Sequence, residues 1–310
     1  MTRLTSLVVF AIAIAASASG QTTPLPPVGP ERPFAPAARA ERTLPNGLQV
    51  VALRHATVPK VTAILGIESG LAVEPAEKAG LAQFVVDLSQ EGTTTRSSEQ
   101  IKREVFGLGA SLSGFAGQDV STFQMRGLNS TLPQMLTILA DVVRNPSFPP
   151  SELDLMKATT AQRLQAQTAS PQYVNNKMFR QTLFGNHPYA RIGVTPETLP
   201  AIDRQSIVNF QQTYYRPNNA VLIVVGDVAA EAVFAAADQA FGAWERRALP
   251  ETRPVPLPAL KGRTLVFVQR PNSVQSSISV GNFTPERNDP RWYTLQLANQ
   301  IFGGASTRAW

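Results

Sequence analysis

The chain has few side chains of the kinds that bind metal ions or attack carbonyl groups. Its 310 residues include no cysteine and two histidines, His55 and His187. Disulfides, thiolate metal sites, a cysteine nucleophile and any site of three histidines are therefore excluded. Neither histidine has a second His or a Glu at the spacing of metal ligands, so we expect both to make local contacts only. The motifs of serine hydrolases, P-loop nucleotidases and dinucleotide-binding enzymes are also missing from the sequence.

Composition narrows the classes of protein further. Lys and Arg number 28 against 22 Asp and Glu, a net charge of +6, and the basic residues are scattered, so we predict no nucleic-acid partner. A hydrophobic content of 43% with 16% charged residues is typical of a folded protein with a buried core. No apolar run long enough to cross a bilayer follows residue 20, so we expect no integral membrane span.

The N-terminal segment has the pattern of a targeting sequence. Residues 1–20 combine Arg3, an apolar stretch and the small residues Ala16-Ser17-Ala18, which is typical of a secretory signal peptide. Residues 21–41 are rich in proline and are expected to form an extended leader. We therefore predict that the protein is exported and is periplasmic or secreted.

The remaining sequence predicts alternating strands and helices. Two strand-like runs at 48–54 and 61–68 precede a helix at 77–91. Ser97 and Gln100 form a capping box that opens a second helix, and alternation over 110–127 predicts a β-hairpin. Further helices are expected at 130–144, 151–167, 171–183, 203–214 and 231–241, with a strand at 220–225.

A second, shorter unit follows a proline-rich linker at 249–262. When residues 265–307 are laid on 50–92, Gly66 falls on Gly281 and the strand–turn–strand–helix order recurs. We therefore predict an α+β fold made of a duplicated unit, an antiparallel sheet packed by helices. The first copy spans 42–248, and the second, at 263–310, is expected to be truncated after its first helix.

The helix expected at 77–91 carries a set of residues that resembles one protein family. The frame consists of Gly80, Leu81, Ala82 and Phe84, followed by Gly92 and Thr93. It is similar to the zinc-site helix of the M16 peptidases (insulinase, pitrilysin and mitochondrial processing peptidase). Further similar segments are His187-Pro188-Tyr189, 215–219, 241–244 and Gly303-Gly304. The resemblance covers 42–310 and implies the M16-type (LuxS/metallohydrolase-like) α/β roll for both copies.

The departure from this family pattern concerns the residues that do its chemistry. Active members carry His-x-x-Glu-His, where this sequence has Gln83, Val86 and Asp87, and the third zinc ligand of the family corresponds to Arg163. An amide, an Asp and a guanidinium are a poor donor set for Zn²⁺, and Val86 cannot take a proton from a metal-bound water. We therefore predict no cofactor and no catalytic residue, and we expect Asp87 and Arg163 to form an ion pair in place of the metal.

The resemblance also implies a function without catalysis. M16 proteins enclose a chamber in which a peptide extends a sheet edge, here expected at Ser113, Gly114, Phe115 and Ala116. Some bacterial members pair a chain without the zinc motif with an active one. We therefore expect a pseudopeptidase subunit that binds peptide or unfolded polypeptide beside an active M16 partner. The alternatives are a stand-alone peptide-binding or scaffold protein, an active M16-type metalloendopeptidase, and an enzyme that uses another site.

Overall fold

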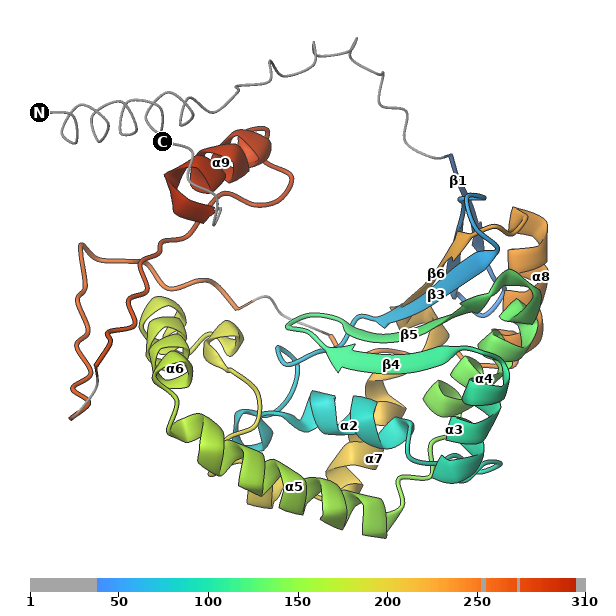
Figure 1. The fold of residues 1–310 in the computed structure, drawn as a ribbon, viewed down its shortest axis with the longest axis horizontal. Helices are drawn as coiled ribbons and strands as arrows, with labels where there is room; N and C mark the ends of the chain where they lie inside the picture. Colours follow the sequence, from blue (N-terminus) through green and yellow to red (C-terminus); the bar gives the residue numbers. More distant parts are fainter. Residues whose placement is uncertain (1–37, 252–254, 272–273, 305–310) are drawn as a thin grey trace, which may run out of the picture. The chain divides into compact units, whose positions relative to one another are not determined.

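The structure is a computed structural model that describes residues 38–251, 255–271 and 274–304. Its centre is a six-stranded sheet with the order β1-β2-β6-β3-β5-β4 (Figure 1). The strands are β1 (Arg39–Thr43), β2 (Gln49–Arg54), β3 (Lys60–Ile67), β4 (Ser111–Ala116), β5 (Ser121–Leu128) and β6 (Ala220–Gly226). The expected strands at 48–54, 61–68 and 220–225 and the hairpin at 110–127 are thereby confirmed.

The sheet is mixed, which corrects the expectation of an antiparallel sheet. β2 and β6 run parallel, while the other neighbouring strands in the order pair antiparallel. A tight turn can join only antiparallel neighbours, whereas β2 and β6 are separated by three strands and several helices, a connection long enough for β6 to enter the sheet in the direction of β2. The α+β class is confirmed.

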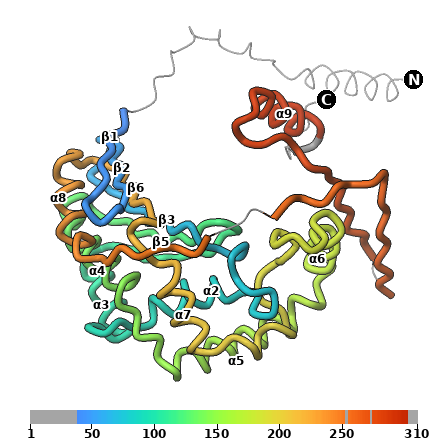
Figure 2. Tube along the Cα trace, turned by 180° about the vertical axis from the view of Figure 1, so that it is seen from behind, coloured from blue at the N-terminus to red at the C-terminus, as the bar shows by residue number. Residues whose placement is uncertain are grey.

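Helices cover one face of this sheet (Figure 2). The helices that precede the linker are α2 (Leu81–Ser89), α3 (Ser98–Gly107), α4 (Leu132–Arg144), α5 (Pro150–Thr168), α6 (Pro171–Phe184), α7 (Arg204–Tyr214) and α8 (Ala230–Phe241). Short 3-10 turns join them at 76–78, 129–131, 188–190, 199–201 and 217–219. The capping box of α3 forms as predicted, since Ser97 and Gln100 each bond the other's backbone N–H.

The core lies between the helices and the inner face of the sheet. In β6, Ala220, Leu222 and Val224 are buried and alternate with half-buried residues, which is the pattern of a sheet covered on one side. The apolar stripe of α4 packs there too, with Met135, Leu136 and Leu139 fully buried. The core therefore fixes α2 under the β4–β5 end of the sheet.

Two predicted boundaries differ from the structure. β1 begins at Arg39, so residues 39–41 belong to the sheet and not to the leader, the rest of which lies outside the described residues apart from residue 38. The helix expected at 77–91 is interrupted: a 3-10 turn spans Ala76–Lys78, and α2 begins only at Leu81. Gly80 causes the break because its φ of 97° is left-handed and incompatible with a helix interior.

The segment after the linker forms a helix but not the expected strands. In the described residues 255–271 and 274–291 no strand is assigned, and Leu265, Ile278 and Val280 are almost fully exposed. Strand-like alternation alone does not make a strand when no neighbouring backbone accepts the ladder bonds. The first helix expected in the second copy forms as α9 (Trp292–Asn299) and continues as a π-helix at Gln300–Gly304. The expected signal peptide lies outside the described residues.

Candidate functional site

The candidate site lies where α2 passes beneath the edge strand β4. The start of α2 is held by Glu74, whose carboxylate accepts hydrogen bonds from the backbone N–H groups of Gly80 at 2.8 Å and Ala82 at 3.0 Å. Glu74 is 3% exposed. Burial raises the pKa of its carboxyl group to about 7, against the lowering effect of those two bonds and of the Arg191 charge. Glu74 therefore fixes the position from which α2 presents its site residues.

Gln83 connects α2 to β4. Its side-chain Nε2 donates to Asp87 Oδ1 at 2.7 Å, and its Oε1 accepts the backbone N–H of Ala116 at 2.9 Å. Gln83 and Asp87 lie one helical turn apart, which is why their side chains meet. The two positions to which the sequence resemblance assigns histidines are thus bonded to each other, and Gln83 is also bonded to the edge strand.

Val86 closes the space between helix and strand. It is fully buried, and a Cβ added to Gly114 would lie 2.4 Å from Val86 Cγ1 and 3.0 Å from Gln90 Nε2. Only glycine therefore fits at position 114 while valine occupies position 86. The position that the sequence resemblance assigns to a catalytic Glu is therefore filled by apolar packing.

Arg163 lies on α5 and contributes its charge to the site, but the expected ion pair with Asp87 is wrong. The carboxylate of Asp87 bonds Gln83 instead, and Arg163 is exposed. Burial raises the pKa of Asp87, and the Gln83 hydrogen bond and the Arg163 charge oppose that rise. A neutral amide at bonding distance satisfies the half-buried carboxylate, so the long Arg163 side chain stays in solvent.

The donor set of this site does not fit a zinc ion. Gln83 has its amide oxygen committed to Ala116, Asp87 is bonded to Gln83, and Arg163 brings a permanent positive charge. Among the described residues no group of three His, Cys, Asp or Glu side chains could hold a metal ion. His55 makes a local bond with Thr57, as expected. His187 bonds its own turn at Tyr189 N, but its ring also lies 3.0 Å from the linker carbonyl of Val255, so the expectation of local contacts only is wrong for His187.

The sequence-predicted peptide-binding segment, Ser113 to Ala116, lies in β4, and β4 forms one edge of the described sheet. Gly117 N donates to Val120 O at 2.8 Å, so Gly117 and Val120 form a hydrogen-bonded pair at the end of the β4–β5 ladder. Alternation along an antiparallel ladder then directs the N–H and C=O groups of Ser113 and Phe115 toward β5. Those of Leu112, Gly114 and Ala116 face outward. The Phe115 side chain is 64% exposed on the other face of the sheet.

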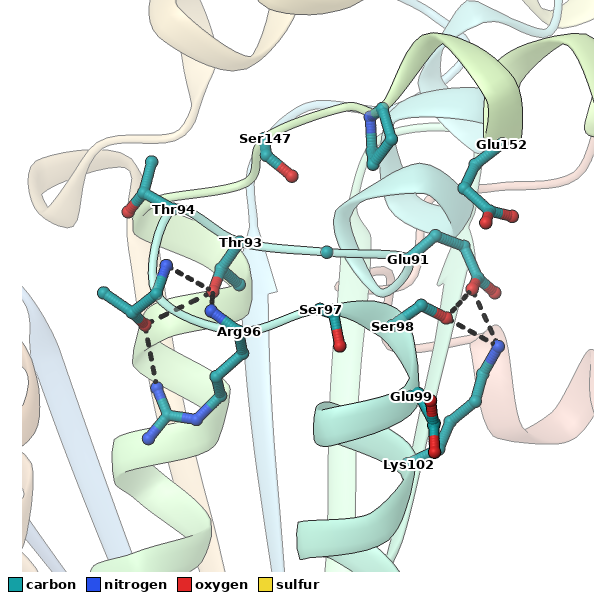
Figure 3. A pocket seen from close by; sticks show the side chains of 13 residues that line it. Glu91, Thr93, Thr94, Arg96, Ser97, Ser98, Glu99, Lys102, Ser147 and Glu152 are labelled. Carbon is teal, nitrogen blue, oxygen red and sulfur yellow. Dashed lines mark hydrogen bonds and ion pairs between the residues drawn. The ribbon is translucent and has the colours of Figure 1, made fainter.

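The loop after α2 forms an open pocket of about 810 Å³ beside α3 (Figure 3). Two of its charged side chains are held by bonds: Glu91 accepts from Ser98 and Lys102, and Arg96 donates at 2.7 Å to Asp141, which lies outside the lining. Asp141 is buried on α4. Burial raises the pKa of its carboxyl group, but bonds from Asn145, two threonines and Arg96 outweigh burial and lower it. These bonds hold the loop that ends the site helix.

Glu74 and Asp141, which position α2 at its two ends, were not predicted from the sequence. The signal for Asp141 was a single acidic residue within the apolar helix 130–144. Glu74 had no comparable signal, because its role depends on a turn that brings its carboxylate to the helix start six residues later in the chain.

Comparison with known proteins places this geometry in a family. Residues 50–197 match the model of insulinase (peptidase family M16), and residues 201–309 match that of the peptidase M16 inactive domain. An uncharacterized zinc protease of Mycobacterium tuberculosis is 28% identical over 292 residues, 92% of this chain and 66% of that protein. The chain therefore spans less than two thirds of the length of this relative, by a narrow margin.

Solved structures agree on the fold. The peptidase M16 inactive domain from Pseudomonas fluorescens superposes with a TM-score of 0.73 at 22% identity, covering 86% of this chain and 65% of that one. The periplasmic protease PqqL from Escherichia coli superposes with a TM-score of 0.66 at 22% identity, covering 73% and 26%. With two models of one family matched in succession along its length, the chain belongs to the insulinase (M16) peptidase family.

Proposed function

We propose that this protein is a non-catalytic M16 subunit that binds extended polypeptide along β4, in a chamber completed by an active zinc-bearing M16 partner. The observation that carries the proposal is a contrast between α2, where the positions assigned to the metal are occupied by other contacts, and β4, where the backbone groups are still open to a further strand. The positions of the zinc ligands and the base hold Gln83, Asp87 and Val86, which bond or pack against protein groups. The backbone of the neighbouring strand still faces outward at Leu112 and Gly114.

An edge strand suits sequence-tolerant recognition. Main-chain N–H and C=O groups supply the affinity when a polypeptide adds as a further strand, and side chains need only alternate between two faces. Beside β4 one of these faces is the sheet surface that carries Phe115, and the other is the α2 side beneath Gly114. This arrangement supports binding of unfolded segments, with an apolar contact available at Phe115.

Strand addition is tested by removing one outward-facing N–H group. Leu112→Pro deletes such a group, and an edge strand tolerates proline on that side. Leu112→Ala is the matched control, since it shortens the side chain and keeps the N–H. We expect Leu112→Pro to lose most of the binding of a fluorescein-labelled peptide of alternating threonine and valine, measured by anisotropy, while Leu112→Ala keeps it. Equal binding by both variants would contradict strand addition at β4.

The partner is tested by purification from the native host. A stoichiometric companion that carries His-x-x-Glu-His, and whose peptidase activity rises with this chain, is the expected result. Peptide binding with no such companion would favour the stand-alone alternative. Chelator-insensitive peptide hydrolysis by the purified chain alone would overturn the non-catalytic proposal.

Export belongs to the same proposal. It rests on the signal-peptide pattern of residues 1–20 and agrees with the periplasmic location stated for PqqL. No helix among the described residues has the length and apolarity required to span a bilayer. Cell fractionation with detection of the processed chain tests export directly.

A further inference from the structure

The free edge of β4 is open at two of its three outward-facing residues and closed at the third. The N–H groups of Leu112, Gly114 and Ala116 face away from β5. Among the described residues no strand pairs with this edge. At Ala116, however, the outward N–H already donates to Gln83 Oε1 at 2.9 Å. A side chain from α2 therefore makes the bond that an added strand would make there.

The Gln83 amide is held in this orientation from both ends. Its Nε2 donates to Asp87 Oδ1 at 2.7 Å, so rotating the amide away from Ala116 also breaks the bond to a half-buried carboxylate. The β4–β5 turn beyond Ala116 is itself tied down, because Tyr189 donates from its hydroxyl to Asp119 at 2.8 Å. Among the side-chain hydrogen bonds of the described residues, the bond of Gln83 to Ala116 is the one that reaches an outward N–H group of β4, and Leu112 and Gly114 have no corresponding bond.

We propose that Gln83 is a latch that determines the register of polypeptide binding at β4. The latch competes with an incoming strand for the Ala116 N–H, so a bound strand pairs with Leu112 and Gly114 and ends before Ala116. This inference rests on the proposed peptide-binding function, and it assigns to Gln83 a specificity-determining role. Gln83 thereby also protects the end of an exposed strand from unspecific pairing.

Hydrogen exchange in the free chain tests the latch without any peptide. We expect the Ala116 amide to exchange about fivefold faster in Gln83→Ala, since one hydrogen bond of ordinary net strength is lost. Gln83→Met, which keeps most of the side-chain volume, should give the same result if packing is preserved. Gln90→Ala is the matched control, because Gln90 bonds its own helix at Val86 O and should leave Ala116 unchanged.

Peptide affinity provides the second measurement. Anisotropy with the threonine–valine peptide should show binding about fivefold tighter for Gln83→Ala and Gln83→Met than for the wild type and Gln90→Ala. Faster exchange without tighter binding would overturn the register proposal, and so would unchanged exchange in both Gln83 variants. If no variant binds peptide, the proposed function fails, while accelerated Ala116 exchange would still support Gln83 as the group that closes this edge.

Discussion

Glu74 brings a carboxyl group into the interior at the start of α2, and its titration should be visible in the stability of the whole domain. Its pKa of about 7 lies above the ordinary value of 4.5, so the folded protein keeps a proton that the unfolded chain releases between these pH values. The free energy of unfolding should therefore fall as pH rises through this interval, by ~3 kcal/mol from this group.

Urea denaturation across that pH range checks this prediction with Glu74→Gln as the comparison. The amide does not titrate, so the variant should lose this component of the pH dependence, although it is less stable overall because one backbone N–H faces its NH₂ group. Identical pH profiles for the two proteins would show that Glu74 is not buried as a protonated acid.

The carboxyl group of Asp141 changes the pH dependence of stability in the opposite direction to Glu74. Its pKa is lowered because the hydrogen bonds from Asn145, Thr93, Thr95 and Arg96 outweigh burial. The stability it contributes is present above its unfolded-state pKa and is lost as pH falls through the lower folded-state pKa. We expect Asp141→Asn to lower the free energy of unfolding by about 2 kcal/mol at neutral pH, as measured by urea denaturation. The difference from the wild type should be smaller in acid, where Asp141 itself is protonated.

Glu104→Gln provides the control for Asp141, because Glu104 pairs with the same Arg96 from the exposed side. Exposed ion pairs contribute about 1 kcal/mol at most, so this variant should change stability little. Equal losses in the two variants would mean that Asp141 is not the group that holds the loop.

At the scale of elements, the close contact between α2 and β4 depends on the absence of a side chain at Gly114, opposite Val86. Gly114→Ala should destabilise the protein by about 1–3 kcal/mol, because the new methyl group would overlap Val86 Cγ1. Adding Val86→Ala should recover part of this loss, since the space needed by the methyl group is then vacated. Thermal denaturation of both single variants and the double variant measures the coupling, and purely additive effects would contradict direct contact.

The elements themselves were largely predictable from the sequence because their signals are local. The Ser97–Gln100 capping box, the alternation in 110–127 and the apolar stripe of α4 each require only neighbouring residues. The parallel pairing of β2 with β6 and the contribution of β1 were not predictable, since they join distant or polar segments. The strands expected after the linker are not assigned, because their apolar residues have no neighbouring backbone to pair with.

The sequence predicted which residues lie at the candidate site, but it did not predict which hydrogen bonds they make. The family frame around Gly80 and Thr93 located Gln83, Val86, Asp87 and the α5 position Arg163, all from sequence. The hydrogen-bond partner of Asp87 depends on side-chain positions that the sequence does not specify. In the structure the Gln83 amide lies 2.7 Å from the Asp87 carboxylate and makes the bond that was expected from Arg163. The same amide reaches Ala116, a contact between residues 33 positions apart that no local pattern indicates.

At the scale of the whole molecule, we propose that this M16 chain has intramolecular hydrogen bonds and apolar packing where active members hold their metal-binding groups. The replacement should be reversible in part: combining Gln83→His, Asp87→His and Arg163→Glu restores the family's donor types on α2 and α5. Val86→Glu would also restore the base, but it places a charge in a fully buried position and should destabilise the fold.

The most direct test is the metal content of the purified chain after exposure to zinc and desalting, measured by elemental analysis beside the Gln83→His/Asp87→His/Arg163→Glu variant. We expect the wild-type chain to retain zinc far below stoichiometry and the variant to retain clearly more. Stoichiometric zinc in the wild-type chain that disappears in Asp87→Ala would contradict the account, because it would show that α2 still holds the ion.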